Sequence, residues 1–462
     1  MAALPPSTAD AYFPDERWTV TASGTTGAVG MPITLTWSLV PDGTAIRNGG
    51  PSNLVNYFDD LFGSNTSGDL TQRAWFHVIE ESFDRWSQLS GITFVYEPND
   101  DGPRLQDFSG YLGVRGDVRI GGTFVDGPTG TLAYSSLPDG GDIVFDTGET
   151  NLLMDSAHNY RRFRNTLMHE LGHAFGLLHI ESSTDALLME PFISSSIDGP
   201  QLDDIRGIQA LYGDPFEKSH EGLGNDIFER ATRLGSLPFG GGLEIGTDGV
   251  GGQSVDPTET DFVSIANRSD VDFYSFTTSA PALLNAFLKP LGGVFSQGLE
   301  EDTQSLFDAN ARSNLSLSVF ADDGTTLLSF ANAAGNGQVE SISDLTLATA
   351  GTYYVRVTGA SLNVQLYQLQ LSAMALSFGC CGDYNHDGAI DAADYVLWRK
   401  NDGTQDGYNT WRANIGRTAG GGAMSKATAP EPATARLIVL GAAIGCWSTR
   451  STRRARSKTR FA

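Results

Sequence analysis

The stretch His169-Glu170-Leu-Gly-His173-Ala-Phe-Gly176-Leu-Leu-His179 decides how this chain folds around its site. On a helix, His169 and His173 stand four residues apart, so both imidazoles project from one face, with Glu170 beside them. A helix rises about 1.5 Å per residue and would carry His179 roughly 15 Å from His169, so it must end before His179 if the three rings are to meet. Gly176 allows this reversal, because glycine enters the left-handed conformation at no steric cost.

Three imidazoles and one carboxylate match the chemistry of a hydrolytic zinc site. Three protein ligands leave the fourth tetrahedral position open to water, which is typical of catalytic zinc and not of structural zinc. The alternative is a histidine-rich amphipathic helix that binds nothing, but the chain has only seven histidines and three of them fall in this motif. We therefore predict that His169, His173 and His179 bind zinc. Glu170 is then the general base for a zinc-activated water.

The residues around this motif resemble the matrixin branch of the metzincin metalloproteases, over roughly Met31 to Gly213. The segment Ala186-Leu-Leu-Met189-Glu-Pro191 is similar to the family's turn whose methionine lies beneath the zinc ligands, although ordinary core packing would also suit Met189. The resemblance implies a zinc metalloendopeptidase that acts on protein or peptide substrates. It also implies a specificity pocket, formed by Pro191, Phe192 and Ile193. The family's usual tyrosine is replaced by Ile193, which leaves the subsite preference open.

Hydrophobic periodicity predicts an α+β catalytic domain, with a mixed sheet and the zinc helix. Strands are expected at Ile33–Trp37, Ile92–Tyr96 and Val118–Ile120. An amphipathic helix is expected over Thr71–Leu89, with inward residues Ala74, Val78, Phe83 and Trp86. A last helix is expected from Leu202 to Tyr212, closed by Gly213.

Acidic side chains and glycine turns are concentrated between residues 126 and 149, and calcium prefers such oxygen ligands. In matrixins the matching positions bind structural calcium, so the resemblance implies two ions. One is held by Asp126, Asp146 and Glu149, and the second by Asp142. Plain acidic turns are the alternative. The family's structural zinc is not expected, because Tyr134 and Val144 replace its histidines, so we expect one catalytic zinc.

Composition indicates several domains and an acidic surface. The 462 residues carry 55 acidic and 30 basic side chains, a formal charge of −25, which argues against a nucleic-acid partner. Only three cysteines occur, none of them in the catalytic region, so neither a disulfide framework nor a thiol that caps the zinc is expected. Residues 1–30 read as an N-terminal extension, and no signal peptide is predicted within them.

After a polar linker at 214–224, residues 225–375 show short alternating strands, which predict an antiparallel β-sandwich. Asp270-Val-Asp272-Phe-Tyr274 and Gly351-Thr-Tyr-Tyr354 resemble the bacterial pre-peptidase C-terminal domain. Substrate adhesion, secretion and plain spacing are all open as its role.

Residues 380–419 predict a small helical, calcium-binding module. Oxygen donors stand at positions 1, 3, 5, 7, 9 and 12 of a loop of EF-hand type: Asp383, Asn385, Asp387, Ala389, Asp391 and Asp394. Aspartate at position 12 resembles dockerin repeats, which implies a cohesin-like partner. A full dockerin would have two such loops, and an acidic turn is the alternative.

The end of the chain, residues 420–462, resembles a PEP-CTERM sorting tail. Pro430-Glu-Pro432, the apolar run Leu437–Trp447 and a basic cluster follow one another. The run is too short for a comfortable membrane-spanning helix, which needs about 20 residues, so the resemblance implies a transient membrane anchor. A disordered basic terminus is the alternative.

These features together predict an exported, modular bacterial metalloendopeptidase at the cell envelope or beyond. A different class remains open: a surface adhesion or scaffold protein with a vestigial peptidase domain, against which the intact Glu170 and three histidines argue. A zinc peptidase with a distant glutamate as third ligand is disfavoured, because His179 already stands at the expected spacing.

Overall fold

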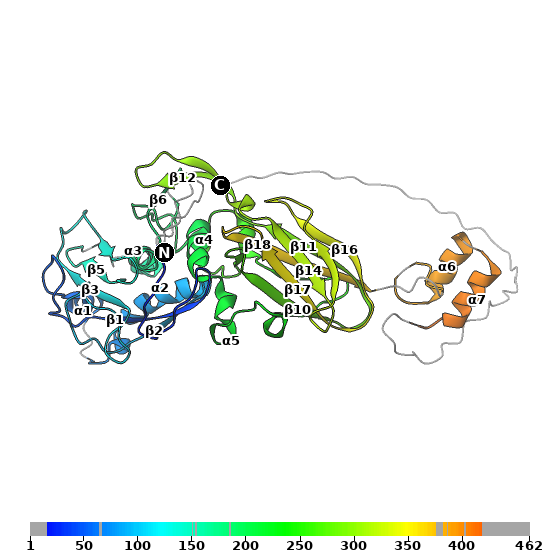
Figure 1. Ribbon diagram of the computed structural model, residues 1–462, viewed down its shortest axis with the longest axis horizontal. Helices are drawn as coiled ribbons and strands as arrows, with labels where there is room; N and C mark the ends of the chain where they lie inside the picture. The colour runs from blue at the N-terminus through cyan, green and yellow to red at the C-terminus, as the bar shows by residue number, and fades with distance from the viewer. Residues whose placement is uncertain are drawn as a thin grey trace, which may run out of the picture.

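The computed structural model describes residues 16–63, 67–149, 151–152, 155–183, 186–375, 382–385, 387–401 and 403–417. Along the chain it shows a mixed α/β region, a β-sandwich and a pair of short helices (Figure 1). The predicted sorting tail and the three cysteines lie outside the described residues. None of the described helices is long and apolar enough to cross a bilayer.

The catalytic region contains a five-stranded mixed sheet in the order β2-β1-β3-β5-β4. Its strands are β1 (Ile33–Leu39), β2 (Ile92–Tyr96), β3 (Val118–Thr123), β4 (Ala133–Ser135) and β5 (Ile143–Asp146). Four of them run parallel, and only the edge strand β4 is antiparallel to its neighbour β5. The predicted α+β architecture with a mixed sheet is confirmed.

Four helices accompany this sheet: α1 (Leu54–Phe62), α2 (Phe76–Leu89), α3 (Arg161–Ala174) and α4 (Leu202–Tyr212). Trp37 of β1 stacks on Phe83 of α2 with 4.5 Å between ring centroids, and Trp86 Nε1 donates a hydrogen bond to the Met168 carbonyl of α3 at 3.0 Å. Helix α2 therefore joins the sheet to the helix that carries the histidine motif.

The start of α2 differs from its prediction. The helix begins at Phe76 and not at Thr71, because a separate 3-10 turn, Leu70–Gln72, precedes it. Trp75 is buried and its Nε1 donates to the Asp59 carboxylate at 2.9 Å, so a tertiary contact fixes the chain at this point. Ala74, predicted to face inward, is exposed.

The N-terminal segment packs on the zinc helix although the predicted catalytic domain starts at Met31. Trp18 is 1% exposed, and its Nε1 donates to the carbonyl of Ala174, the last residue of α3, at 2.8 Å. Arg17 donates to the Leu211 carbonyl at 3.1 Å. Residues just before the predicted boundary therefore complete the core around the motif.

Two packed sheets form the β-sandwich, in the orders β15-β14-β17-β10-β7 and β16-β11-β18-β8, with β9 paired to β18. Its strands are β7 (Thr232–Ser236), β8 (Gly242–Ile245), β9 (Val263–Ile265), β10 (Val271–Thr278), β11 (Ala282–Pro290), β14 (Leu315–Phe320), β15 (Leu327–Ala331), β16 (Glu340–Leu347), β17 (Gly351–Gly359) and β18 (Gln365–Ala375). The predicted sandwich is confirmed. The sandwich is not wholly antiparallel, because β7 runs parallel to β10. The strands β8 and β9 of the other sheet lie between β7 and β10 along the chain, so no hairpin joins this parallel pair.

One hairpin leaves the sandwich and joins the catalytic region. Strands β12 (Val294–Leu299) and β13 (Ser305–Asp308) form a three-stranded sheet with β6 (Ile180–Ser182), the short strand that follows His179 (Figure 1). The predicted linker 214–224, which contains the short helix α5 (Ser219–Gly222), is also packed in: Asp214 is 1% exposed and accepts a hydrogen bond from Ser264 N at 3.1 Å. The two domains therefore share an extensive junction.

The last described elements are α6 (Ala392–Asn401) and α7 (Gln405–Asn414), the helical pieces predicted for the calcium module. Their aromatic side chains pack together, with 5.0 Å between the ring centroids of Tyr395 and Trp411. Trp411 Nε1 donates to the Asp391 carbonyl at 2.7 Å, which ties α7 to the loop.

Candidate metal centre

Helix α3 presents the first two histidines from one face. The ring centroids of His169 and His173 lie 4.8 Å apart, one helical turn from each other. The helix ends at Ala174, and Gly176 follows with φ +103°, a conformation that side chains rarely adopt. A Cβ there would lie 1.9 Å from the Glu16 carbonyl oxygen, so glycine is required for both the turn and the close approach.

This turn brings His179 back to the helix. His169 Nε2 and His179 Nε2 are 3.1 Å apart, and donor nitrogens of all three histidines lie within 4.8 Å of one another. Two nitrogens bound to one tetrahedral zinc at about 2.0–2.1 Å would stand about 3.3 Å apart. The spacing therefore fits three ligands of a single zinc ion.

Hydrogen bonds set the tautomer of each ring. His169 Nδ1 donates to the Leu188 carbonyl and His173 Nδ1 to the Leu177 carbonyl, both at 2.7 Å. His179 Nδ1 donates to Glu300 Oε2 at 2.7 Å. Because these partners only accept, the proton belongs on Nδ1 and each Nε2 keeps its lone pair for a metal.

Burial also shapes the charge of the site. Desolvation lowers the pKa of His169 to about 3 and that of His173 to about 4, so both imidazoles are neutral, the form that binds metal. Glu170 is 6% exposed, and desolvation raises the pKa of its carboxyl to about 8. A divalent cation beside it would favour the carboxylate, which is the form a general base needs.

Met189 lies directly beneath the zinc helix. It is 2% exposed, and a Cβ on Gly172 would lie 2.3 Å from its sulfur, so the glycine between His169 and His173 leaves room for the thioether. Asp204 holds the turn, because its carboxylate accepts from Leu188 N at 2.8 Å and Met189 N at 3.1 Å. Sequence reasoning missed Asp204; its position in an acidic first turn of α4 resembles an ordinary helix cap.

The predicted pocket residues follow this turn with very different exposure. Phe192 is 85% exposed and Ile193 is 36% exposed, whereas Pro191 is only half-buried. Their contact with substrate stays a prediction.

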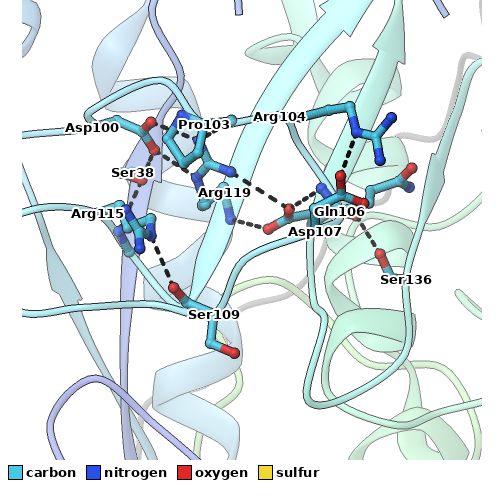
Figure 2. A network of polar contacts seen from close by, with 12 residues as sticks. Ser38, Asp100, Pro103, Arg104, Gln106, Asp107, Ser109, Arg115, Arg119 and Ser136 are labelled. Carbon is cyan, nitrogen blue, oxygen red and sulfur yellow. Dashed lines mark hydrogen bonds and ion pairs between the residues drawn. The ribbon is translucent and has the colours of Figure 1, made fainter. Parts of the chain in front are cut away.

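Asp142, predicted to hold a second calcium, lies beside a buried arginine. The Arg119 side chain is fully buried and binds Asp100 through Nε and Nη2 at 2.8 and 2.7 Å (Figure 2). Its Nη1 is 3.9 Å from Asp142 Oδ2, and burial raises the pKa of Asp142 to about 7. Asp142 thus has a cationic neighbour of its own, and calcium at this position stays a prediction.

The other three predicted calcium ligands hold a loop through backbone hydrogen bonds. Asp146 accepts from Gly127 N at 2.6 Å and from Gly148 N at 2.7 Å. Glu149 accepts from Thr129 N, and Asp126 accepts from Thr131 N. Their role as calcium ligands remains a prediction, because the groups of three possible ligand side chains within 4.8 Å found among the described residues do not include them.

The predicted calcium loop of the last module closes on Asp394. This carboxylate is fully buried and accepts from Tyr384 N, Asn385 N and Asp391 N. Asp383 Oδ1 is buried without a hydrogen-bond partner, as a metal ligand would be before its ion binds. The remaining predicted donors, Asp387 and Ala389, are joined by a 2.9 Å hydrogen bond within the loop.

A second carboxylate group lies at the domain junction. Oxygens of Glu217, Asp226 and Asp270 lie within 4.8 Å of one another. Desolvation and the neighbouring Asp270 raise the pKa of Glu217 to about 10, and desolvation raises that of Asp270 to about 8. Sequence reasoning missed this group, because Glu217 fell in the predicted linker and its partners are distant in sequence.

Comparison with known proteins agrees with this site. A mixed sheet that carries such a histidine triad is the arrangement expected of a zinc peptidase site. Residues 62–213 match the family model described as Matrixin, and residues 270–359 match the Bacterial pre-peptidase C-terminal domain. The histidine triad lies within the region that matches the Matrixin model.

Curated relatives match this same part of the chain. Interstitial collagenase of Equus caballus is 38% identical over 155 residues, which are 32% of this chain and 30% of that protein. The hatching enzyme of Paracentrotus lividus is 34% identical over 155 residues, 33% of this chain and 24% of that protein. The chain therefore spans less than a third of the length of these relatives. The pre-peptidase C-terminal domain of a Bacillus anthracis collagenase is 12% identical, with a TM-score of 0.18 over 31% of this chain and 93% of that domain, a superposition too poor to bear on the fold.

Proposed function

We propose that this chain is a zinc-dependent metalloendopeptidase that hydrolyses peptide bonds in proteins. The observation that carries the proposal is that nitrogens of three histidines lie within 4.8 Å of one another, while the Nδ1 atom of each ring is hydrogen-bonded to an acceptor. His169, His173 and His179 would hold the metal. Zinc, when bound, supplies a Lewis acid that acidifies water and polarises the scissile carbonyl.

Glu170 moves the proton in this reaction. It lies in the same helical turn as His169 and His173 and is itself buried. Its carboxylate accepts the proton of the attacking water and later donates it to the leaving amine. An adhesion or scaffold protein with a vestigial peptidase domain would have no use for this buried carboxylate, which costs free energy to keep without a partner.

A conservative substitution tests the proposal. Glu170→Gln keeps the shape of the side chain and all three ligands, so zinc content is expected to stay at one ion per chain while casein hydrolysis falls by about 10²–10⁴-fold. Glu181→Gln, the same change on the adjacent strand β6, is the matched control and is expected to keep full activity. Wild-type hydrolysis by Glu170→Gln, or normal zinc binding by His169→Ala, would contradict the assignment.

The finer features of the sequence extend this proposal. The pre-peptidase domain supports export from a bacterial cell. The dockerin-like loop is proposed to bind calcium, supported by the unpartnered buried Asp383 Oδ1, and a cohesin-like partner and a PEP-CTERM-like tail remain proposals from sequence alone. Asp383→Asn should weaken calcium binding in a titration calorimeter by at least tenfold, whereas Asp406→Asn, outside the loop on α7, should not. Equal calcium affinities for the two variants would refute the loop assignment.

A further inference from the structure

The three zinc ligands differ in what holds their outer nitrogens. His169 and His173 donate to backbone carbonyls of the catalytic domain, Leu188 and Leu177. His179 instead donates to the carboxylate of Glu300, which lies 121 residues further along the chain, in the hairpin loop of the sandwich domain. The third ligand is therefore the one whose orientation depends on a charged side chain from another domain.

The hairpin is placed for this contact by its pairing with β6. Leu299 of β12 stands opposite Ile180, the residue directly after His179, and Gln297 stands opposite Ser182. Glu300 follows Leu299 immediately, so the register of this ladder sets the position of its carboxylate beside His179. A slip of one residue would turn every side chain of β12 to the opposite face and move Glu300 away from His179.

Two side-chain contacts anchor the hairpin to helix α4 of the catalytic domain. Gln297 Nε2 donates to Asp203 Oδ2 at 3.1 Å, and both side chains are buried. The guanidinium of Arg206 lies 4.8 Å from the ring centroid of Phe307 on β13. These contacts are specific and largely shielded from water, so they fix the position of the hairpin next to the three histidines.

We propose that Glu300 is a positioning residue for the zinc ligand His179, so that the sandwich domain completes the metal centre built by the catalytic domain. This inference rests on the proposed zinc-dependent function. A carboxylate that accepts from the outer nitrogen of a metal-bound imidazole fixes the tautomer and the ring orientation and increases the basicity of the ligating nitrogen. Loss of such a partner typically weakens metal binding by about 10–100-fold.

Zinc affinity of the full chain tests the role of Glu300 directly, by competition with a chromophoric chelator. Glu300→Ala is expected to weaken zinc binding by about 10–100-fold, and Glu300→Gln by less, because its amide oxygen still accepts the hydrogen bond without the charge. Glu301→Ala is the matched control: the same charge is lost from the next residue of the same loop, and zinc affinity should not change. A Glu300→Ala protein that binds zinc within twofold of wild type would overturn the inference.

Two further measurements separate positioning from simple destabilisation. The Glu300 side chain is 48% exposed, so the Tm of the metal-free Glu300→Ala protein should equal that of wild type; a large fall would show a structural role instead. The absorption bands of the cobalt-substituted protein should shift in Glu300→Gln, because the ligand field at the metal changes. Unchanged bands would contradict the proposal.

The hairpin anchor supplies a double-mutant test. Gln297→Ala should weaken zinc binding by loosening the seat of Glu300, and it should cause little further loss when combined with Glu300→Ala. Fully additive losses would mean that the hairpin does not act through Glu300. The proposed function fails if wild type binds no zinc, or if His169→Ala does not abolish the zinc binding of wild type. If His169→Ala abolishes zinc binding but Glu300→Ala leaves it intact, only the inference about Glu300 fails.

Discussion

Gly176→Ala is expected to damage both the fold and the metal centre, for reasons that can be separated. Gly176 has φ +103° in the turn between the zinc helix and His179. A Cβ there would lie 1.9 Å from the Glu16 carbonyl oxygen and 3.0 Å from the Glu16 carbonyl carbon. Alanine thus meets a backbone conformation it disfavours and a backbone atom it cannot overlap.

The two costs add to a large loss of stability. Holding a non-glycine residue in such a conformation costs about 1–3 kcal/mol. Relieving the collision requires the segment around Glu16 to move by more than about 1 Å, and overpacking of this kind costs about 1–3 kcal/mol. The segment cannot move freely, because Trp18 is buried and bonded to the end of α3. We therefore expect the free energy of unfolding to fall by about 2–6 kcal/mol.

Gly43→Ala provides the matched control. Gly43 has φ +94°, and a Cβ there would meet nothing within 4 Å, so only the conformational cost of about 1–3 kcal/mol applies. Guanidinium unfolding of both variants with a chelator present gives the difference. Zinc affinity should fall at least tenfold in Gly176→Ala, because the displaced turn carries His179 with it, and should be unchanged in Gly43→Ala. Equal destabilisation by the two substitutions would refute the role of the collision.

Met189→Ala should reduce the free energy of unfolding by about 2–5 kcal/mol, because the Met189 side chain is buried beneath the zinc helix. Met189→Leu, measured in the same chemical denaturation assay, should reduce it by less than about 1.5 kcal/mol. Similar losses for the two variants would argue against a packing role. The junction carboxyl of Glu217 has a folded pKa of about 10, above an unfolded value of about 4.3, so its contribution to stability is complete below pH 4 and is lost as pH rises toward 10. With a chelator present, the Tm should therefore fall between pH 5.5 and pH 8.5, and it should fall less in Glu217→Gln; an equal fall would show that Glu217 does not titrate in this way.

Local patterns were sufficient for most of the regular elements of the catalytic region and for the three histidines of the candidate metal centre. The expected bounds of β2 and α4 coincide with the observed ones, because each has a strong period and a clear end signal. The three histidines and the turn between them lie within eleven consecutive residues, so their geometry follows from helix pitch and glycine conformation alone. The start of α2 was wrong because the buried Trp75 and its bond to Asp59 outweigh local helix propensity.

The contacts that sequence could not predict join residues far apart along the chain. Trp18 meets Ala174 across 156 residues, and Glu300 meets His179 across 121. Arg119 next to Asp142 and Asp204 beneath the Met189 turn are further cases. No periodicity connects such pairs, because each depends on how complete elements pack. In the sequence, Glu300 is one of several acidic residues in a loop, so nothing marks it as the hydrogen-bond partner of His179.

These contacts show that the part of the chain that orients the histidines extends beyond Gly213. Composition changes after Gly213, yet α4, the helix that ends there, is buried along its whole length. Its Leu202 and Ile205 pack with Phe262 and Leu366 of the second domain, and β6 has its only described strand partner in β12. Burial of α4 in turn fixes Asp204, which holds the turn of Met189 and the carbonyl that accepts from His169. Two of the three histidines thus hydrogen-bond to groups whose positions depend on the sandwich domain, so we expect metal binding to require both domains.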